Sequence, residues 1–235
     1  MLLPHPPGAD EVLRAGDRFL AARAAMSPTA CRAKHGECLD ALQKRDDKEY
    51  RSPTSPTDLA ERETIELEFA SRPGRRVGVA ITARNSLVNT FLFYQLLAWM
   101  GLSTGDWIAR LEAGDDTLKR SVNGFNDLLA GIEVDVFTDG KWARATSRFD
   151  ELGPIAKERQ VVPIDLPATA KGPVKVRLTL VRGYWKVDAA HLVALTGEGV
   201  TPVRVPATIV DNAEATKQLR DPKKLLVSMP TDEWM

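Results

Sequence analysis

The chain has 235 residues, of which 43% are hydrophobic and 27% are charged, the balance of an ordinary globular protein. Lysine plus arginine equals aspartate plus glutamate at 32 each, so the formal net charge is zero. This balance argues against a nucleic-acid-binding protein, which usually carries a basic excess. The short basic stretch RPGRR at 72–76 is interpreted as a turn with solvated arginines. The length suits one large domain, or one domain with an insertion.

The sequence of the N-terminal region predicts little regular structure there. Its first residues, MLLPHPPGADEVLRAGDRF, show neither the basic start nor the apolar segment of a signal peptide. We therefore expect a cytoplasmic protein if the chain is complete, and an exported or cell-envelope protein if an upstream segment is missing. A helix is expected at 9–26, where apolar residues can share one helical face, and a shorter one at 37–44. Residues 1–57 are interpreted as a partly helical or irregular lead-in.

Two cysteines and a histidine lie close together in this lead-in. Cys31, His35 and Cys38 form a C-x3-H-x2-C pattern, whose thiolate and imidazole groups are ligands that zinc prefers. A structural zinc site needs four ligands, and His5 is the one further candidate on this side of the chain. The alternatives are a single disulfide, two free thiols, or a weak metal site. The sequence predicts no cofactor.

Strands are expected at 64–69 and 77–83, where apolar and other residues alternate with a period of two. In the second strand Val77, Val79 and Ile81 share one face, and only small residues occupy the other. Small residues on one face of a strand indicate that another element packs closely there.

A nearly continuous apolar run follows, bounded by Ser86, a good N-cap, and Gly101, a good helix end. The apolar residues cover most of the circumference of the expected helix, which is typical of a buried helix. We therefore expect a core helix packed against the small-residue face of the sheet. The run at 87–102 is too short and too polar to be read as a membrane span.

Two more helices are expected at 104–114 and 115–131, each ending at a glycine. Asp139-Gly140 is a strong signal for a two-residue hairpin turn. Further strands are expected at 132–137, 141–149, 158–167, 172–183, 184–195 and 200–206, and a helix and a strand at 211–222 and 224–230.

This order of elements predicts a mainly β chain, an antiparallel, jelly-roll-like β-sandwich with a helical block inserted between strands. The sandwich would span 58–210, with the insertion at 86–131 and a C-terminal extension at 211–235. The alternative is an α+β sheet whose helices cover one face.

The segment from Val134 to Leu195 resembles the C-terminal half of galactose-binding-like jelly-roll domains, which include discoidin-type and carbohydrate-binding-module domains. This likeness covers about a quarter of the chain. It rests on Arg177, Leu178, Gly183, Trp185, Val187 and Asp188. The start of the apolar helix, ARNSL-NT, is also similar to that of a group of bacterial proteins without a known activity. The resemblance implies binding of carbohydrate, and it implies a structural role for Asp188.

Six residues are candidate ligand-binding residues: Arg84, Asn85, Asn89, Trp142, Tyr184 and Trp185. The first three lie where a strand passes into the apolar helix, so they either line a polar pocket or cap and anchor that helix. The three aromatic residues flank turns, where their rings could bind sugars or simply pack. An aromatic surface open to water favours sugar binding, and burial of all three rings favours a structural role.

No catalytic residue is predicted. His191 lies in an expected strand, and the chain lacks the G-x-S-x-G pattern of a nucleophile elbow. The sequence therefore predicts a non-enzymatic module that binds carbohydrate or a surface glycan. The alternatives are a structural or protein-interaction domain of a larger assembly and, less favoured, a hydrolase that would need His191 beside a serine or a carboxylate. The expected partners are carbohydrate or protein, with no nucleic acid and no membrane span.

Overall fold

The computed structural model describes residues 3–129, 131–145, 153–167 and 172–203. The elements expected at 211–222 and 224–230 lie outside the described residues, as does the whole extension at 211–235. The chain divides into two units, one formed by Met1–Pro4 with Thr201–Met235 and the other by His5–Val200. Only residues 3–4 and 201–203 of the first unit are described, and the fold below is that of the second.

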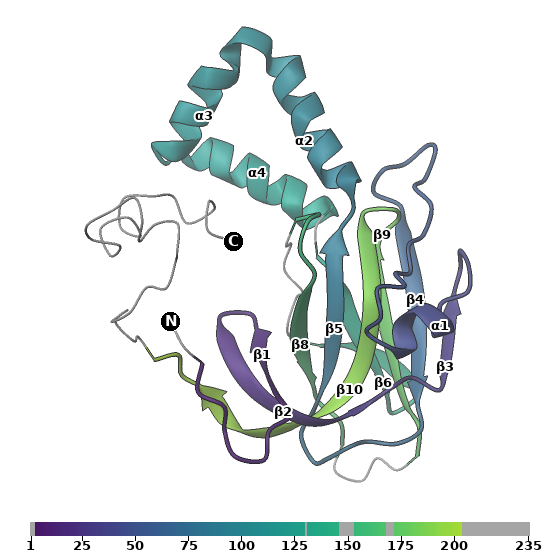
Figure 1. The fold of residues 1–235 in the computed structure, drawn as a ribbon. Coiled ribbons are helices and arrows are strands. Elements are labelled where there is room, and N and C mark those ends of the chain that lie inside the picture. Colours follow the sequence, from purple (N-terminus) through teal and green to yellow (C-terminus); the bar gives the residue numbers. More distant parts are fainter. Residues whose placement is uncertain (1–2, 130, 146–152, 168–171, 204–235) are drawn as a thin grey trace, which may run out of the picture. The chain divides into compact units, whose positions relative to one another are not determined.

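Two five-stranded sheets form the scaffold (Figure 1). The first contains, in spatial order, β1 (Glu11–Ala15), β2 (Arg18–Met26), β10 (Trp185–Val200), β5 (Val77–Asn85) and β8 (Glu158–Ile164). Its neighbouring strands are antiparallel, except that Arg14 of β1 pairs in parallel with Gln160 of β8 and so closes the sheet into a barrel. The second contains, in order, β3 (Ala30–Ala33), β4 (Arg62–Phe69), β9 (Val174–Val181), β6 (Glu133–Thr138) and β7 (Lys141–Arg144).

The helices occur mainly in one block. After the short α1 (Leu39–Gln43) they are α2 (Leu87–Met100), the 3-10 turn η1 (Gly101–Ser103), α3 (Thr104–Glu112) and α4 (Asp116–Leu129). Figure 1 shows α2, α3 and α4 following one another around three sides of an open triangle. Ser86 caps α2 by accepting a hydrogen bond from the backbone N–H of Val88, and Gly101 ends it at a positive φ of 53°.

The predicted fold class is confirmed at the level of a mainly β chain with a helical block. Strand β5, before the block, pairs along its length with β8 and β10, which come after it. The hairpin at Asp139-Gly140 is also confirmed, because both residues have positive φ (51° and 77°) and join β6 to β7. The closure of one sheet into a barrel was not predicted.

The helix expected at 9–26 is wrong, because this segment forms the β1–β2 hairpin. Leu13 and Ala15 of β1 alternate with more exposed residues, and they share a buried cluster with Leu20 and Ala22 of β2. A period of two therefore describes this segment better than the helical spacing does. Gly16, with φ of 64°, supplies the left-handed backbone that the tight turn between the two strands needs.

Strand β5 contributes to two separate hydrophobic clusters. Val79 and Ile81 belong to a large core that also draws residues from β4, β6, β9 and β10. Ala80 points the other way, into the smaller cluster enclosed by the barrel. That second cluster consists of Leu13, Ala15, Leu20, Ala22, Ala80, Val161, Val193 and Leu195. The small-residue face of β5 is thus an interior face of the barrel, as the close packing expected there requires.

The element that packs on this face is not the one predicted. None of the residues of α2 is buried, so the prediction that it is a core helix is wrong. Phe91 is 60% exposed and Trp99 is 83% exposed. The physical reason is competition for one surface, because β1 and β2 already cover the small-residue face of β5 and close the barrel over it.

Gly78 tests this account of the barrel. A Cβ atom there would lie 2.6 Å from Cγ2 of Val161 and 3.2 Å from the carbonyl oxygen of Val162. We expect Gly78→Ala to lower the free energy of unfolding by about 1–3 kcal/mol, the usual range for overpacking a core. Gly105→Ala in α3 is the matched control, because nothing lies within 4 Å of its added Cβ. Urea unfolding of both variants checks this, and equal stabilities would contradict the barrel packing.

Candidate functional site

Arg84 has a structural role at the end of β5. Its guanidinium donates to both carboxylate oxygens of Glu49, at 2.6 and 2.9 Å, and to the carbonyl of Pro154 at 2.8 Å. Burial raises the pKa of Glu49, but the hydrogen bond and charge of Arg84 outweigh burial and hold that pKa below its ordinary value. Arg84 therefore ties the segment before β4 to the barrel, and its hydrogen bonds to Glu49 and Pro154 do not reach the helical insertion.

Asp188 strengthens the same junction. It is buried in β10, accepts a hydrogen bond from the backbone N–H of Asp47 at 2.9 Å, and lies 3.4 Å from Nζ of Lys157. Lys157 also contacts the carboxylate of Asp47 directly. These contacts give Asp188 a structural role at this junction.

The two asparagines do not join Arg84 in one pocket. Asn85 is buried, and its side-chain oxygen accepts a hydrogen bond from the backbone N–H of Gly153 at 2.8 Å. Its own backbone N–H donates to the carbonyl of Gly153 at 3.0 Å, so this residue anchors the start of the 153–167 segment. Asn89 lies in the first turn of α2 and lines a cleft between the helices.

Tyr184 and Trp185 are both buried, and at most 1% of the surface of either residue is exposed. The turn that carries them holds the first residue of the helical block, since Ser86 Oγ donates to the carbonyl of Gly183 at 2.6 Å. The backbone N–H of Gly183 in turn donates to Oγ of Ser52 at 3.2 Å. These two aromatic residues therefore support the junction between scaffold and helices and offer no open surface to a sugar.

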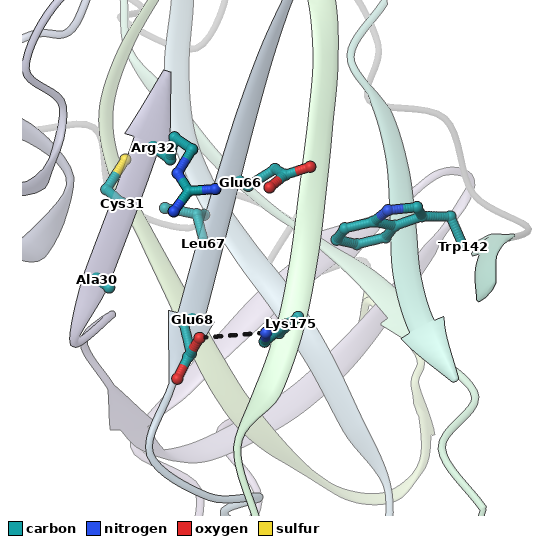
Figure 2. Close-up of a pocket in the computed structure, with 8 residues that line it drawn as sticks. All are labelled: Ala30, Cys31, Arg32, Glu66, Leu67, Glu68, Trp142 and Lys175. Atoms are coloured by element: carbon teal, nitrogen blue, oxygen red, sulfur yellow. Dashed lines mark ion pairs between the residues drawn. The ribbon is translucent and has the colours of Figure 1, made fainter. Parts of the chain in front are cut away.

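Trp142 is the one predicted aromatic candidate that is partly exposed. It lies on β7, in the other sheet, where the guanidinium carbon of Arg177 sits 4.5 Å from the centre of its ring. Phe137 packs edge-on against the same ring at 5.2 Å between centroids. A groove of about 150 Å³ lies on the outer surface of β3, β4 and β9. Figure 2 shows Trp142 at one side of the residues that line it. The groove is lined by Ala30, Cys31, Arg32, Glu66, Leu67, Glu68, Trp142 and Lys175.

A row of alternating charge crosses this outer surface. Strand pairing places the following residues side by side, one from each strand of the second sheet: Arg32, Glu66, Arg177, Asp135 and Arg144. Asp135, almost fully buried, accepts hydrogen bonds from Arg144 at 2.6 Å and from Arg177 at 3.0 Å. The groove itself is lined by two positive side chains, Arg32 and Lys175, and two negative ones, Glu66 and Glu68. A ligand there would meet hydrogen-bonding groups without a large net charge.

The cysteine and histidine pattern is not arranged as a metal site. Cys31 and Cys38 form a disulfide, so neither sulfur is a thiolate. His35 Nδ1 instead lies 2.6 Å from a carboxylate oxygen of buried Glu63, and the hydroxyl of Tyr50 donates to the same oxygen at 3.2 Å. Burial, followed by the nearby Glu63 charge, raises the pKa of Tyr50. Among the described residues no group of three metal-ligating side chains occurs.

His191 lacks the partners that a hydrolase would need. Its Nε2 donates to the carbonyl of Gln43 at 2.9 Å, and its Nδ1 lies 3.3 Å from the guanidinium of Arg159. Arg159 is held in place by Glu11 of β1 at 2.9 and 3.0 Å. The imidazole thus contacts neither a serine nor a carboxylate in the part of the chain that the structure describes.

A large apolar cleft lies within the helical block, and sequence reasoning missed it. Its volume is about 770 Å³, and its lining includes Phe93, Tyr94 and Leu96 of α2 with Trp107 and Ile108 of α3. The all-round apolar pattern of α2 could have indicated it. The same pattern also describes a buried helix, so the sequence could not separate the two.

No protein-family model and no curated protein matches this chain. Within the described ranges, no helix is long and apolar enough to cross a membrane.

The partly buried position of His191 predicts a pH-dependent stability. Burial lowers its pKa, so the unfolded state takes up a proton near pH ~6.5 while the folded state does so only at lower pH. Acidification through that window therefore favours unfolding. We expect urea unfolding to show stability falling between about pH 7 and pH 5, and His191→Gln to reduce this slope. His5→Gln, at an exposed position, is the control, and an unchanged slope in His191→Gln would contradict the assignment.

Proposed function

We propose that this chain is a non-enzymatic docking module, in which a β scaffold presents an apolar helical arm (residues 86–131) to a partner. The observation that carries the proposal is the exposure of large apolar side chains along α2. Leu87 is 72% exposed, and Phe91 and Trp99 have comparable or greater exposure. Contiguous exposed apolar surface on a folded protein usually marks an interaction site.

The arm is attached firmly at both ends, which supports its role as a presented surface. At its start, Val88 and Leu92 pack against the main core, and Ser86 bonds to Gly183. At its end, Leu129 is part of that core. The backbone carbonyl of Leu128 also accepts a hydrogen bond from Arg62 at 2.9 Å. Both ends therefore hold the helices on the scaffold.

The turns inside the arm are also well defined. Asp115 accepts hydrogen bonds from the backbone N–H groups of Thr117 and Leu118, which caps α4. The guanidinium of Arg110 in α3 contacts the same carboxylate at 2.6 Å. That hydrogen bond is the main reason why the pKa of Asp115 lies below its ordinary value. These local contacts support α3 and α4 without burying the apolar side chains of α2.

The proposal predicts that α2 contributes to association more than to folding. We expect Trp99→Ser to change the free energy of unfolding by no more than about 0.5 kcal/mol, as for an ordinary surface position. Ile132→Ala, at a fully buried position beside the arm, is the comparison and should lose about 2–5 kcal/mol. Urea unfolding measures both changes.

The same Trp99→Ser variant should bind a phenyl-substituted matrix more weakly than the original chain, because an exposed apolar contact has been removed. Ser103→Ala, which leaves the apolar side chains of the arm in place, is the control for retention. A different outcome would contradict the proposal. If Trp99→Ser were destabilised as strongly as Ile132→Ala and still bound the phenyl matrix like the original chain, α2 would be a core element and not a docking surface.

A second candidate function is the binding of carbohydrate in the groove beside Trp142. It is favoured by the partly exposed indole ring next to hydrogen-bonding side chains such as Glu66 and Lys175. Aromatic rings with polar neighbours suit sugars, whose C–H faces pack on the ring and whose hydroxyl groups need donors and acceptors. The resemblance to galactose-binding-like jelly-roll domains supports this candidate, and both are proposals.

Glycan-array binding of the original chain beside Trp142→Ala tests this candidate. We expect the substitution to abolish saturable binding, because it removes the one partly exposed ring of the groove. Trp99→Ala in the arm is the matched tryptophan control and should leave glycan binding unchanged. Trp185 is unsuitable for this test, because its side chain is fully buried and its loss would unfold the scaffold. Absence of saturable binding by the original chain would remove the candidate.

A further inference from the structure

We infer that the partner of the arm is a lipid bilayer surface, which the outer face of α2 enters to a shallow depth. The outer face is defined here as Leu87, Phe91, Ala98 and Trp99 of α2 with Leu102 of the following turn. This inference rests on the proposed docking function, because it names the partner of the same helical arm.

The two sides of α2 differ in what they contact. Phe93, Tyr94 and Leu96 line the cleft that α2 shares with α3. Leu87 and Leu96 are nine positions apart, which is about 2.5 turns at ~3.6 residues per turn, so they lie on opposite sides of the helix. At about 100° per residue, Phe91 and Ala98 lie on the same side as Leu87, whereas Trp99 lies about 120° round the helix from Leu87. Leu87, Phe91 and Trp99 are all well exposed, so these large apolar side chains are open outside the cleft.

The absence of charge on this segment favours lipid over a protein partner. From Ser86 to Gly105 the sequence contains no charged residue. Protein interfaces usually surround an apolar centre with a polar rim that fixes orientation. A hydrocarbon boundary requires no such rim, and every charge brought to it carries a cost. An uncharged helix with apolar side chains on both sides matches that boundary.

The polar groups at the end of α2 bond within the arm itself. Ser103 Oγ donates to the carbonyl of Met100 at 2.6 Å, and Thr104 Oγ1 donates to the carbonyl of Leu97 at 2.9 Å. The backbone N–H of Gly101 also donates to carbonyls in the last turn of α2. Internal satisfaction of polar groups is the condition for placing backbone in contact with lipid. The carbonyls of Leu97, Ala98 and Met100 therefore meet this condition within the arm.

Exposure is greatest where the arm turns. Leu102 is 106% exposed, the highest value among the large apolar residues, and Trp99 lies one turn before it. Tryptophan concentrates at membrane–water boundaries, because its ring is apolar and its N–H remains able to bond to water or headgroups. Trp99 and Leu102 are therefore the side chains expected to enter the bilayer first.

The depth of entry is limited by the charges of α3. Asp106 and Arg110 follow the turn closely and are both exposed. They would have to leave water if the arm entered tip-first across a leaflet, which is ~15 Å of hydrocarbon. Shallow insertion of about 5–10 Å, with α2 lying near the boundary, keeps these charges among the headgroups. It requires no helix long enough to span the bilayer.

Vesicle flotation of the full chain tests the inference. The probes are vesicles of pure phosphatidylcholine and of phosphatidylcholine mixed with phosphatidylglycerol, each at low and high salt. We expect the chain to bind both alike and independently of salt, because the inserting segment carries no charge. Trp99→Ser and Leu102→Ser should each weaken binding about tenfold or more. Phe93→Ser, in the cleft and away from the outer face, is the matched control and should bind nearly as the original chain does.

Three results would overturn the lipid inference. Binding restricted to anionic vesicles and removed by salt would show that charge elsewhere drives it. Absence of vesicle binding, together with a concentration-dependent dimer that Trp99→Ser and Leu102→Ser disrupt, would identify a second copy as the partner and leave the docking function standing. If Trp99→Ser and Leu102→Ser changed none of vesicle binding, self-association and phenyl retention, both the lipid inference and the docking function would be wrong.

Discussion

The structure depends on the packing of β1 and β2 against the small-residue face of β5. Gly78 and Ala80 leave room for the side chains of Val161, Leu195 and their neighbours inside a narrow barrel. A larger side chain at Gly78 would meet Val161 at less than van der Waals distance. Because the interior is filled in this way, the barrel offers no face on which the apolar helix α2 could be buried.

The exposure of the arm therefore follows from the closure of the barrel. Strand β5 ends at Asn85 and leads directly through Ser86 into α2, so the helix must begin at the scaffold. The hydrogen bond from Ser86 to Gly183 and the burial of Tyr184 and Trp185 hold this junction. Tyr184 and Trp185, which the sequence suggested as sugar-binding residues, thus stabilise the base of the helical arm.

The two candidate surfaces have opposite chemistry. The groove beside Trp142 is lined by charges that largely neutralise one another, as in the ion pair of Glu68 with Lys175. The outer face of α2 contains no charge and has exposed apolar side chains. Hydrogen-bonding ligands suit the first surface, and apolar partners suit the second. Their positions on different parts of the chain allow each to be altered without touching the other.

The sequence by itself determined the local elements. Alternation placed β4, β5 and β9, a Ser and a Gly bounded α2, and Asp139-Gly140 specified a hairpin, because these signals act between near neighbours along the chain. Only the tertiary structure decided which apolar surfaces are buried. Periodicity shows that a segment has an apolar face but not what covers it. Here the β1–β2 hairpin, mistaken for a helix, covers the face predicted for α2, and that long-range competition leaves α2 exposed.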